Sequence, residues 1–162
     1  MAHRLVFVVG QAAVLALFAP GSVAMAQASQ AAPARASHGT EKQAKAMLER
    51  AVVAMKQDKE RALAMFNKGE GGFKDRDLYV FCANASDGIL VAHPYLKGEN
   101  LTEIKGKKGY PLGKEIMTNA AEGKIKQVSY WWPRPGSDTP LEKHTFYTKV
   151  ASENCGVGYY KD

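Results

Sequence analysis

The chain has 162 residues, with 22 Lys and Arg against 16 Asp and Glu, a formal net charge of +6, and 46% hydrophobic residues. This length allows one domain with a hydrophobic core. The basic residues are spread along the chain rather than gathered in one run, which argues against nucleic-acid binding. A modest positive charge is instead suited to small anions.

Residues 1–26 have the pattern of a secretory signal peptide. A short basic start precedes a segment at 5–20 that is apolar apart from Gln11, and Ala24-Met25-Ala26 fits the small-x-small cleavage rule. The apolar run is shorter than the roughly 20 residues that span a bilayer comfortably. We therefore predict a cleaved signal and a periplasmic mature protein. An uncleaved signal that anchors the protein in the inner membrane is the alternative.

The segment after the signal predicts a disordered leader followed by one long helix. Residues 27–39 are rich in Ala, Ser and Pro and show no periodicity. Thr40 and Gln43 have the capping-box form, and apolar residues follow at helical spacing as far as Phe66. Gly69 is a helix stop signal, so we expect one helix of about 29 residues, which is about 43 Å long at 1.5 Å per residue. The polar residues at 57–60 predict a kink or a more solvent-exposed segment within it.

The second half of the chain predicts an antiparallel sheet. Aromatic and β-branched runs separated by turn residues predict strands, and a segment at 112–122 predicts a short helix. A long helix, a hairpin, a connector and a three-stranded meander make an α+β domain on one sheet. The five expected strands are 78–82, 89–93, 124–132, 141–151 and 155–160.

Two cysteines, Cys82 and Cys155, occur in a chain that we expect to be exported. Disulfides persist outside the cytoplasm, so the economical prediction is one disulfide that closes a loop of 73 residues. Two buried free thiols are the alternative.

Several motifs together resemble the single Cache domain, the extracytoplasmic PAS-like ligand-sensing module of bacterial chemoreceptors and sensor kinases. The resemblance covers 40–160 and supports a domain at 40–162. It implies a five-stranded antiparallel PAS-like sheet whose first and last strands are central neighbours, so that Cys82 would lie beside Cys155. The matching segments are DKERALAMFN, GGFKDRDLYVF, DGILVAHP, GKEIMTNAAEGK, VSYWWPRPG, EKHTFYTKV and CGVGYY.

The resemblance also implies where a ligand would bind and how this chain differs from receptors that carry the same module. The family places its ligand between the sheet and the connector after the second strand, which here is 93–113 and would form a lid. Receptors with this module continue into a second membrane helix and a signalling domain, whereas this chain ends at Asp162. We therefore expect a stand-alone secreted form whose output depends on a membrane-bound sensor or transporter partner.

Strand alternation selects the first candidate ligand contacts. Tyr130 and Trp132 share one face of the third strand, and Lys143 lies on one face of the fourth. If these are the same sheet face, a phenol and an ammonium converge on a site suited to a carboxylate. The resemblance supports this choice, because similar positions line the family's ligand cavity.

His93 is the next candidate, because it ends the second strand where the lid begins. Protonated, it would donate both ring N–H groups to an anion. The alternative is that it bonds the backbone and fixes the turn at Pro94. Tyr95, Tyr79 and Phe73 are further pocket candidates and otherwise belong to the core or the rim.

Two other polar residues of this region, His144 and Arg134, have alternative interpretations. His144 falls on the opposite strand face from Lys143, so we expect it to be a surface or structural residue. Arg134 lies between two prolines, in a loop that could hold its guanidinium over the pocket mouth or leave it in solvent.

These observations predict a non-catalytic periplasmic protein that binds or senses a small organic anion, most plausibly a short carboxylate. An accessory protein that docks on a membrane sensor or transporter is an alternative. A small periplasmic enzyme is less favoured, because no nucleophile with a matching base motif is present. We expect no metal or haem, since the sequence has no C-x-x-C-H and no H-x-x-x-H.

Overall fold

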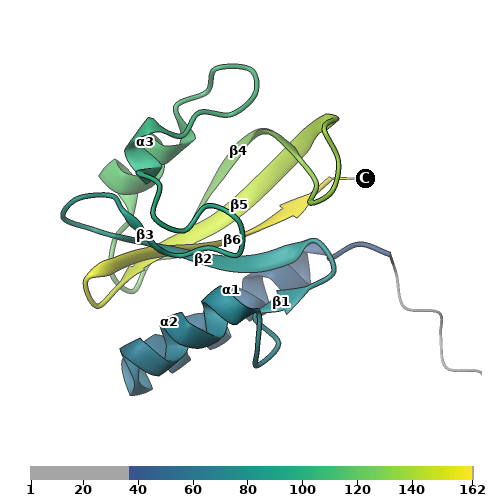
Figure 1. Cartoon of the computed structure of the whole chain (residues 1–162). Helices are drawn as coiled ribbons and strands as arrows, with labels where there is room; N and C mark the ends of the chain where they lie inside the picture. The colour runs from purple at the N-terminus through teal and green to yellow at the C-terminus, as the bar shows by residue number, and fades with distance from the viewer. Residues whose placement is uncertain (1–36, 162) are drawn as a thin grey trace, which may run out of the picture. The chain divides into compact units, whose positions relative to one another are not determined.

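The computed structural model describes residues 37–161, in which two helices cover one face of an antiparallel sheet and a shorter helix lies on the other face (Figure 1). The helices are α1 (Glu41–Gln57), α2 (Lys59–Lys68), the 3-10 helix η1 (Leu101–Glu103) and α3 (Leu112–Asn119). The strands are β1 (Lys74–Asp75), β2 (Leu78–Asn84), β3 (Leu90–Ala92), β4 (Lys126–Pro133), β5 (Pro140–Val150) and β6 (Glu153–Tyr160).

The sheet has the order β1-β2-β6-β5-β4, and β3 pairs with β2. The expected α+β fold and its five strands are confirmed, and β1 adds a sixth strand of two residues. The pairing of β2 with β6 runs from Val80↔Val157 to Asn84↔Glu153. The first and last long strands are therefore central neighbours, although more than 60 residues separate them in the chain.

The long helix that we expected is two helices that meet at Asp58. This residue is extended, with φ −156° and ψ 98°, and it ends α1 and begins α2. Its backbone N–H donates to the carbonyl of Ala54, and its carboxylate accepts from the N–H of Arg61. Asp competes with helical hydrogen bonding through its short side chain, which is why it caps here. The capping box of Thr40 and Gln43 is confirmed.

The expected leader overlaps the fold at its last three residues. Gly39 is buried, and its N–H donates to the carboxylate of Asp77 at 2.7 Å. The guanidinium of Arg76 donates to the carbonyl of His38 at 2.6 Å. Residues 37–39 are therefore bound to the turn between β1 and β2. The rest of the predicted leader and the predicted signal peptide lie outside the described residues.

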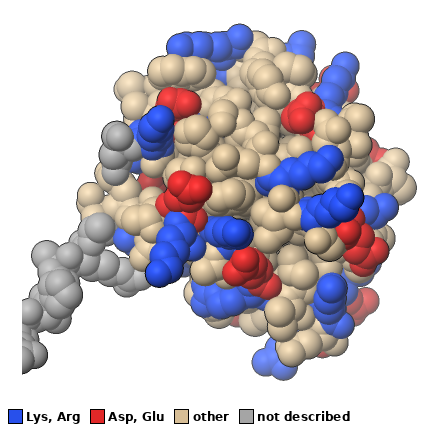
Figure 2. All heavy atoms as spheres, turned by 180° about the vertical axis from the view of Figure 1, so that it is seen from behind, with Lys and Arg blue, Asp and Glu red and all other residues tan. Residues whose placement is uncertain are grey.

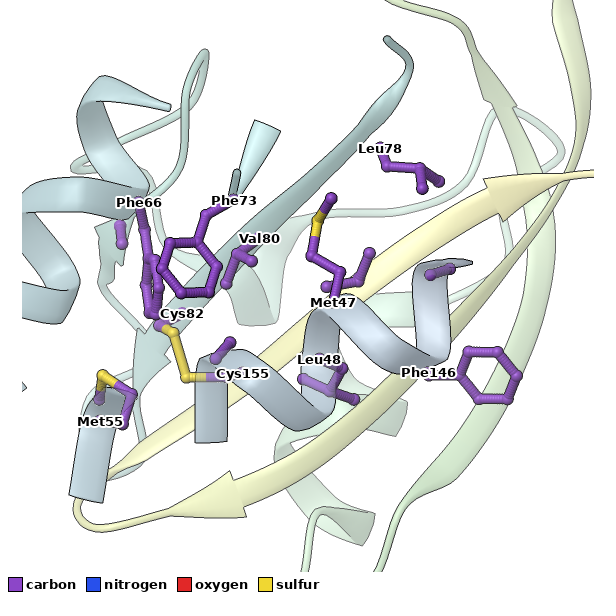
Figure 3. Packing of buried hydrophobic residues seen from close by; sticks show 14 of the residues in the cluster. Met47, Leu48, Met55, Phe66, Phe73, Leu78, Val80, Cys82, Phe146 and Cys155 are labelled. Atoms are coloured by element: carbon purple, nitrogen blue, oxygen red, sulfur yellow. A yellow bond between two sulfur atoms is a disulfide. The ribbon is translucent and has the colours of Figure 1, made fainter. Parts of the chain in front are cut away.

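Each face of the sheet has its own hydrophobic cluster, as strand alternation requires. On β2, Val80 faces the helices and Phe81 faces the other side. The helix-side cluster includes Met47, Leu48, Met55, Phe66, Phe73 and both cysteines (Figure 3). The opposite cluster joins β2, β4 and β5 to the connector and α3, through Phe81, Leu90, Leu101, Leu112, Ile116, Val128, Tyr130 and Tyr147.

Charged side chains of both signs are scattered over the face that Figure 2 shows. Lys and Arg alternate with Asp and Glu there and do not form a continuous basic surface. Within residues 37–161, no helix is both long and apolar enough to cross a membrane.

The expected disulfide is confirmed. Cys82 and Cys155 are direct partners in the β2–β6 register, with their Cα atoms 4.0 Å apart. Their sulfur atoms lie in the helix-side cluster, between the sheet and the helices (Figure 3). The bond therefore joins the two central strands on the face away from α3.

Replacement of both cysteines by alanine should lower the free energy of unfolding by about 4 kcal/mol, the chain-entropy value for a loop of this length. Urea denaturation of the oxidised wild type and the double variant measures the difference. Wild-type protein unfolded with a reductant present should match the variant. A loss below about 1 kcal/mol would show that the bond contributes little to this fold.

Candidate functional site

Two adjoining cavities lie on the face of the sheet that carries α3. The inner one has a volume of about 30 Å³ and the outer one about 190 Å³. Both are lined by Tyr79, His93, Leu96 and Trp132. The inner cavity is also lined by Phe81, Leu90, Leu101, Ile104, Leu112 and Tyr130. The outer cavity adds Tyr95, Pro133, Arg134, Pro135 and Gly136.

The walls of these cavities come from the expected elements. Tyr79 and Phe81 alternate on β2, and Tyr130 and Trp132 alternate on β4, so each pair points to the same sheet face. The connector 93–113 supplies most of the remaining wall, from His93 through Leu112. The connector therefore lies over the cavities, where we expected a lid.

Lys143 is a buried cation beside these cavities. Its side chain is 2% exposed, and its ammonium donates to the hydroxyl of Tyr79 at 2.9 Å. The ammonium also lies 4.4 Å from the ring centroid of Tyr79 and 5.0 Å from that of Tyr160. Burial lowers the pKa of Lys143, although nearby Tyr130 and Asp77 act in the opposite direction. In the described part of the chain, no carboxylate lies within 4.0 Å of this ammonium.

Tyr130 and Lys143 share a sheet face, because they are direct partners in the β4–β5 register. Their side chains do not bond each other, since the hydroxyl of Tyr130 pairs with that of Thr145 at 2.8 Å. Tyr79, which we ranked lower, is the direct partner of the ammonium. Trp132 lies edge-on to Tyr130, with a centroid distance of 6.2 Å, and lines both cavities.

His93 lines both cavities, but our expectation that it donates from both ring nitrogens is wrong. Its Nδ1 accepts the backbone N–H groups of Tyr95 at 3.0 Å and Leu96 at 3.1 Å. Burial, with a smaller effect from Lys143, lowers the pKa of His93 to about 4. The ring is therefore neutral at pH 7, carries its proton on Nε2, and fixes the turn as the alternative interpretation stated.

The remaining candidates divide between the two faces of the sheet. Tyr95 is 50% exposed at the rim and lies edge-on to Tyr79. Phe73 is not among the cavity residues, because it packs edge-on against Phe66 in the helix-side cluster (Figure 3). His144 is on the opposite face from Lys143, as expected, and its Nδ1 lies 2.7 Å from the hydroxyl of Ser129.

Gly158 is a site residue that sequence reasoning missed. A Cβ atom at this position would lie 2.3 Å from Cε of Lys143 and 2.6 Å from Oγ1 of Thr145. The absence of a side chain on β6 therefore makes room for the lysine stem. A glycine within a strand is a signal of close approach, and the C-G-V-G-Y run has two such glycines on the cavity face.

Asp77 and Arg134 form a second polar group at the outer cavity. Nε of Arg134 donates to Asp77 at 3.1 Å, and its guanidinium lies 4.8 Å from the ring centroid of Tyr160. Asp77 is 6% exposed, and the side chain of Arg134 is 17% exposed. Arg134 thus takes the place over the pocket mouth that we considered for it, with its charge paired. Within residues 37–161, no three His, Cys, Asp or Glu residues are grouped to hold a metal ion.

Comparison with known proteins agrees with this architecture. The family model of single Cache domain 2 matches residues 22–162, so the chain belongs to the single Cache domain 2 family, whose members are ligand-sensing domains. A methyl-accepting chemotaxis protein from Vibrio parahaemolyticus RIMD 2210633 has a similar structure. It is 22% identical with a TM-score of 0.60, and the match covers 75% of this chain and 88% of that one.

Two further solved structures have the same fold. A periplasmic sensor domain of a chemotaxis protein is 22% identical with a TM-score of 0.56, and the match covers 75% of this chain and 90% of that one. The other is a Cache chemosensory domain whose structure is described as the basis of its carboxylic acid recognition. It is 20% identical with a TM-score of 0.56, and the match covers 75% of this chain and 88% of that one. At these identities, the likeness shows the fold alone.

The pKa of His93 predicts a pH dependence of stability. A folded-state pKa of about 4, below the unfolded value near 6.5, leaves the fold most stable above pH 6.5 and weakens it as the pH falls towards 4. For His93→Asn, whose amide oxygen can replace Nδ1 as acceptor, the loss of stability between pH 7.5 and pH 5 should be about 2 kcal/mol smaller than for wild type. Urea denaturation at both pH values measures it.

His93→Ala is the matched comparison, because it removes the acceptor of two backbone N–H groups. At pH 7.5 it should be less stable than His93→Asn by about 1–3 kcal/mol. Equal stability of the two variants would contradict the role given to Nδ1. An unchanged pH dependence in His93→Asn would contradict the neutral, buried state of the ring.

Proposed function

We propose that this chain is a non-catalytic periplasmic protein that binds a short organic carboxylate and makes its occupancy available to a membrane-bound sensor or transporter. The observation that carries the proposal is the buried ammonium of Lys143. It has three N–H donors, of which one is bonded to Tyr79, and no carboxylate within ion-pair distance in the described part of the chain. A buried cation with so few partners is costly, and an anionic ligand offsets that cost.

The hydroxyl of Tyr79 connects the ammonium to the cavities. Lys143 does not line either cavity, whereas Tyr79 lines both. Burial raises the pKa of Tyr79, so its hydroxyl keeps its proton at neutral pH. Because the hydroxyl oxygen accepts from Lys143, its own proton is available to a ligand in the cavity. The Nε2–H of His93 is a second donor on the same wall, so a carboxylate would accept from both.

The shape of the site favours a short ligand. The inner cavity has about the volume of one water molecule, about 30 Å³, and is lined mainly by apolar side chains. It suits a methyl or similar group, while the carboxylate lies on the side of Tyr79 and His93. A ligand of about four to six heavy atoms is limited to about −6 to −9 kcal/mol, so affinity in the micromolar range or weaker is expected.

The comparisons support this proposal without deciding the ligand. The family consists of ligand-sensing domains, and a neighbour in fold is described by its recognition of carboxylic acids. Two neighbours are parts of chemotaxis proteins, and one of these is a periplasmic sensor domain. The similarity to chemotaxis proteins supports a membrane-bound sensor as the proposed partner.

Titration calorimetry with acetate, propionate, pyruvate, lactate and C4 diacids tests the proposal. We expect at least one of these acids to bind wild type, and Lys143→Met to weaken its affinity at least about 30-fold, because the variant keeps the buried stem and removes the charge. Tyr79→Phe should weaken it about ten-fold, since one hydrogen bond is lost.

Lys97→Met is the matched control, because Lys97 is an exposed lysine of the connector and its charge is screened. It should bind like wild type. Thermal unfolding verifies that each variant folds. No binding of any acid to a folded wild type would refute the carboxylate ligand, and equal affinities of Lys143→Met and wild type would refute the role of the ammonium.

A further inference from the structure

Within residues 37–161, three buried or mostly buried charged side chains lie at or beside the two cavities, and of these only Arg134 lines one of them. Lys143 and Arg134 are cationic, Asp77 is anionic, and His93 is neutral. Lys74 lies over the ring of Tyr95 at the rim, but it is exposed, so water and salt screen its charge. Together, the side chains of Lys143, Arg134 and Asp77 carry one positive charge.

Asp77 is held firmly in its place beside Arg134. Its carboxylate accepts from the N–H of Gly39 at 2.7 Å and from Nε of Arg134 at 3.1 Å, and Nδ1 of His38 lies 3.5 Å away. Because the carboxylate has partners from two distant segments, it cannot turn away when an anion enters. Arg134 is thus paired with an anion that belongs to the protein.

The two cations lie close enough to act on the same ligand. The ammonium of Lys143 is 5.0 Å and the guanidinium carbon of Arg134 is 4.8 Å from the ring centroid of Tyr160. The greatest possible separation of these two atoms is therefore about 10 Å, the sum of the two distances. At such distances in a mostly buried site, a change of one charge should alter the affinity for an anion about ten-fold or more.

We infer that Asp77 makes the site selective for monocarboxylates, an inference that rests on the proposed function. Asp77 neutralises Arg134 and leaves the charge of Lys143 for one carboxylate. A dicarboxylate of similar size brings a second negative charge to the outer cavity, where the guanidinium of Arg134 is already paired with Asp77. Burying that charge without a counter-charge is unfavourable, so the site rejects it.

The test compares each diacid with its monoamide, which has the same number of heavy atoms and one negative charge fewer. The pairs are oxalate and oxamate, malonate and malonamate, and succinate and succinamate, titrated by calorimetry at neutral pH. Wild type should prefer the monoamide at least about ten-fold in one or more pairs. In Asp77→Asn, whose amide oxygen can still accept from Gly39, the preference should fall about ten-fold or reverse.

Two further variants separate charge from shape. Arg134→Gln should weaken the binding of both members of each pair, because it lowers the charge around the cavities by one. The double variant Asp77→Asn, Arg134→Gln restores the wild-type charge and should recover the preference for the monoamide. Asp138→Asn is the matched control, because it removes an exposed carboxylate from the β4–β5 loop that also contains Arg134. This variant should keep the wild-type preference for the monoamide.

Each outcome decides the inference. Equal affinity for the two members of every pair in wild type, or a preference unchanged in Asp77→Asn, would overturn it. If acetate or pyruvate binds but neither member of any pair does, size and not Asp77 excludes the diacids, which also overturns it. If no carboxylate binds wild type at all, the proposed function itself has failed.

Discussion

The pairing of β2 with β6 is the constraint on which the rest of this structure depends. It joins strands that are far apart in the chain and makes them the centre of the sheet. Tyr79 on β2, Gly158 on β6 and Lys143 on β5 come together only because these three strands are adjacent. A disulfide at the direct partners Cys82 and Cys155 holds this pairing covalently. The site is therefore a consequence of topology more than of any local motif.

The buried lysine explains several features that otherwise look unrelated. Its stem needs space, which the missing side chain of Gly158 provides. Its charge needs favourable surroundings, which the rings of Tyr79 and Tyr160 supply through their negative faces. These contacts reduce the cost of burial but supply no counter-charge. A fold that keeps such a group beside two cavities has the properties of an anion site that is completed by its ligand.

Strand alternation was enough to predict which residues of β4 and β5 share a sheet face, because it depends only on chain geometry. It placed Tyr130, Trp132 and Lys143 on one sheet face, and it separated His144 from them. The capping box, the α+β fold and the position of the lid connector were also predictable from local signals. The break at Asp58 was noticed as an interruption, but whether an Asp caps two helices or faces solvent in one depends on how each helix packs.

Other parts of the site could not be predicted, because they depend on contacts between distant segments. Nothing local indicates that Asp77 would meet both Gly39 and Arg134, which lie 38 and 57 residues away in the chain. Likewise, the state of His93 is fixed by two backbone N–H groups whose direction depends on how the connector turns. Phe73 was misplaced because it precedes the two-residue strand β1 and belongs to no strand itself, so alternation assigns it no face.

The two faces of the sheet differ in what they carry: one holds the disulfide and the helix-side cluster, and the other holds the cavities. The face toward α1 and α2 holds an apolar cluster and the disulfide. The opposite face carries the polar groups to which we assign the proposed ligand, among them Lys143, Tyr79 and the Tyr130–Thr145 pair. Because successive residues of a strand point to opposite faces, Cys82 can be varied without touching the wall formed by Phe81. The helix-side core can therefore compensate for the unfavourable burial of a charge, and the cavity face can change its ligand contacts while the fold is retained.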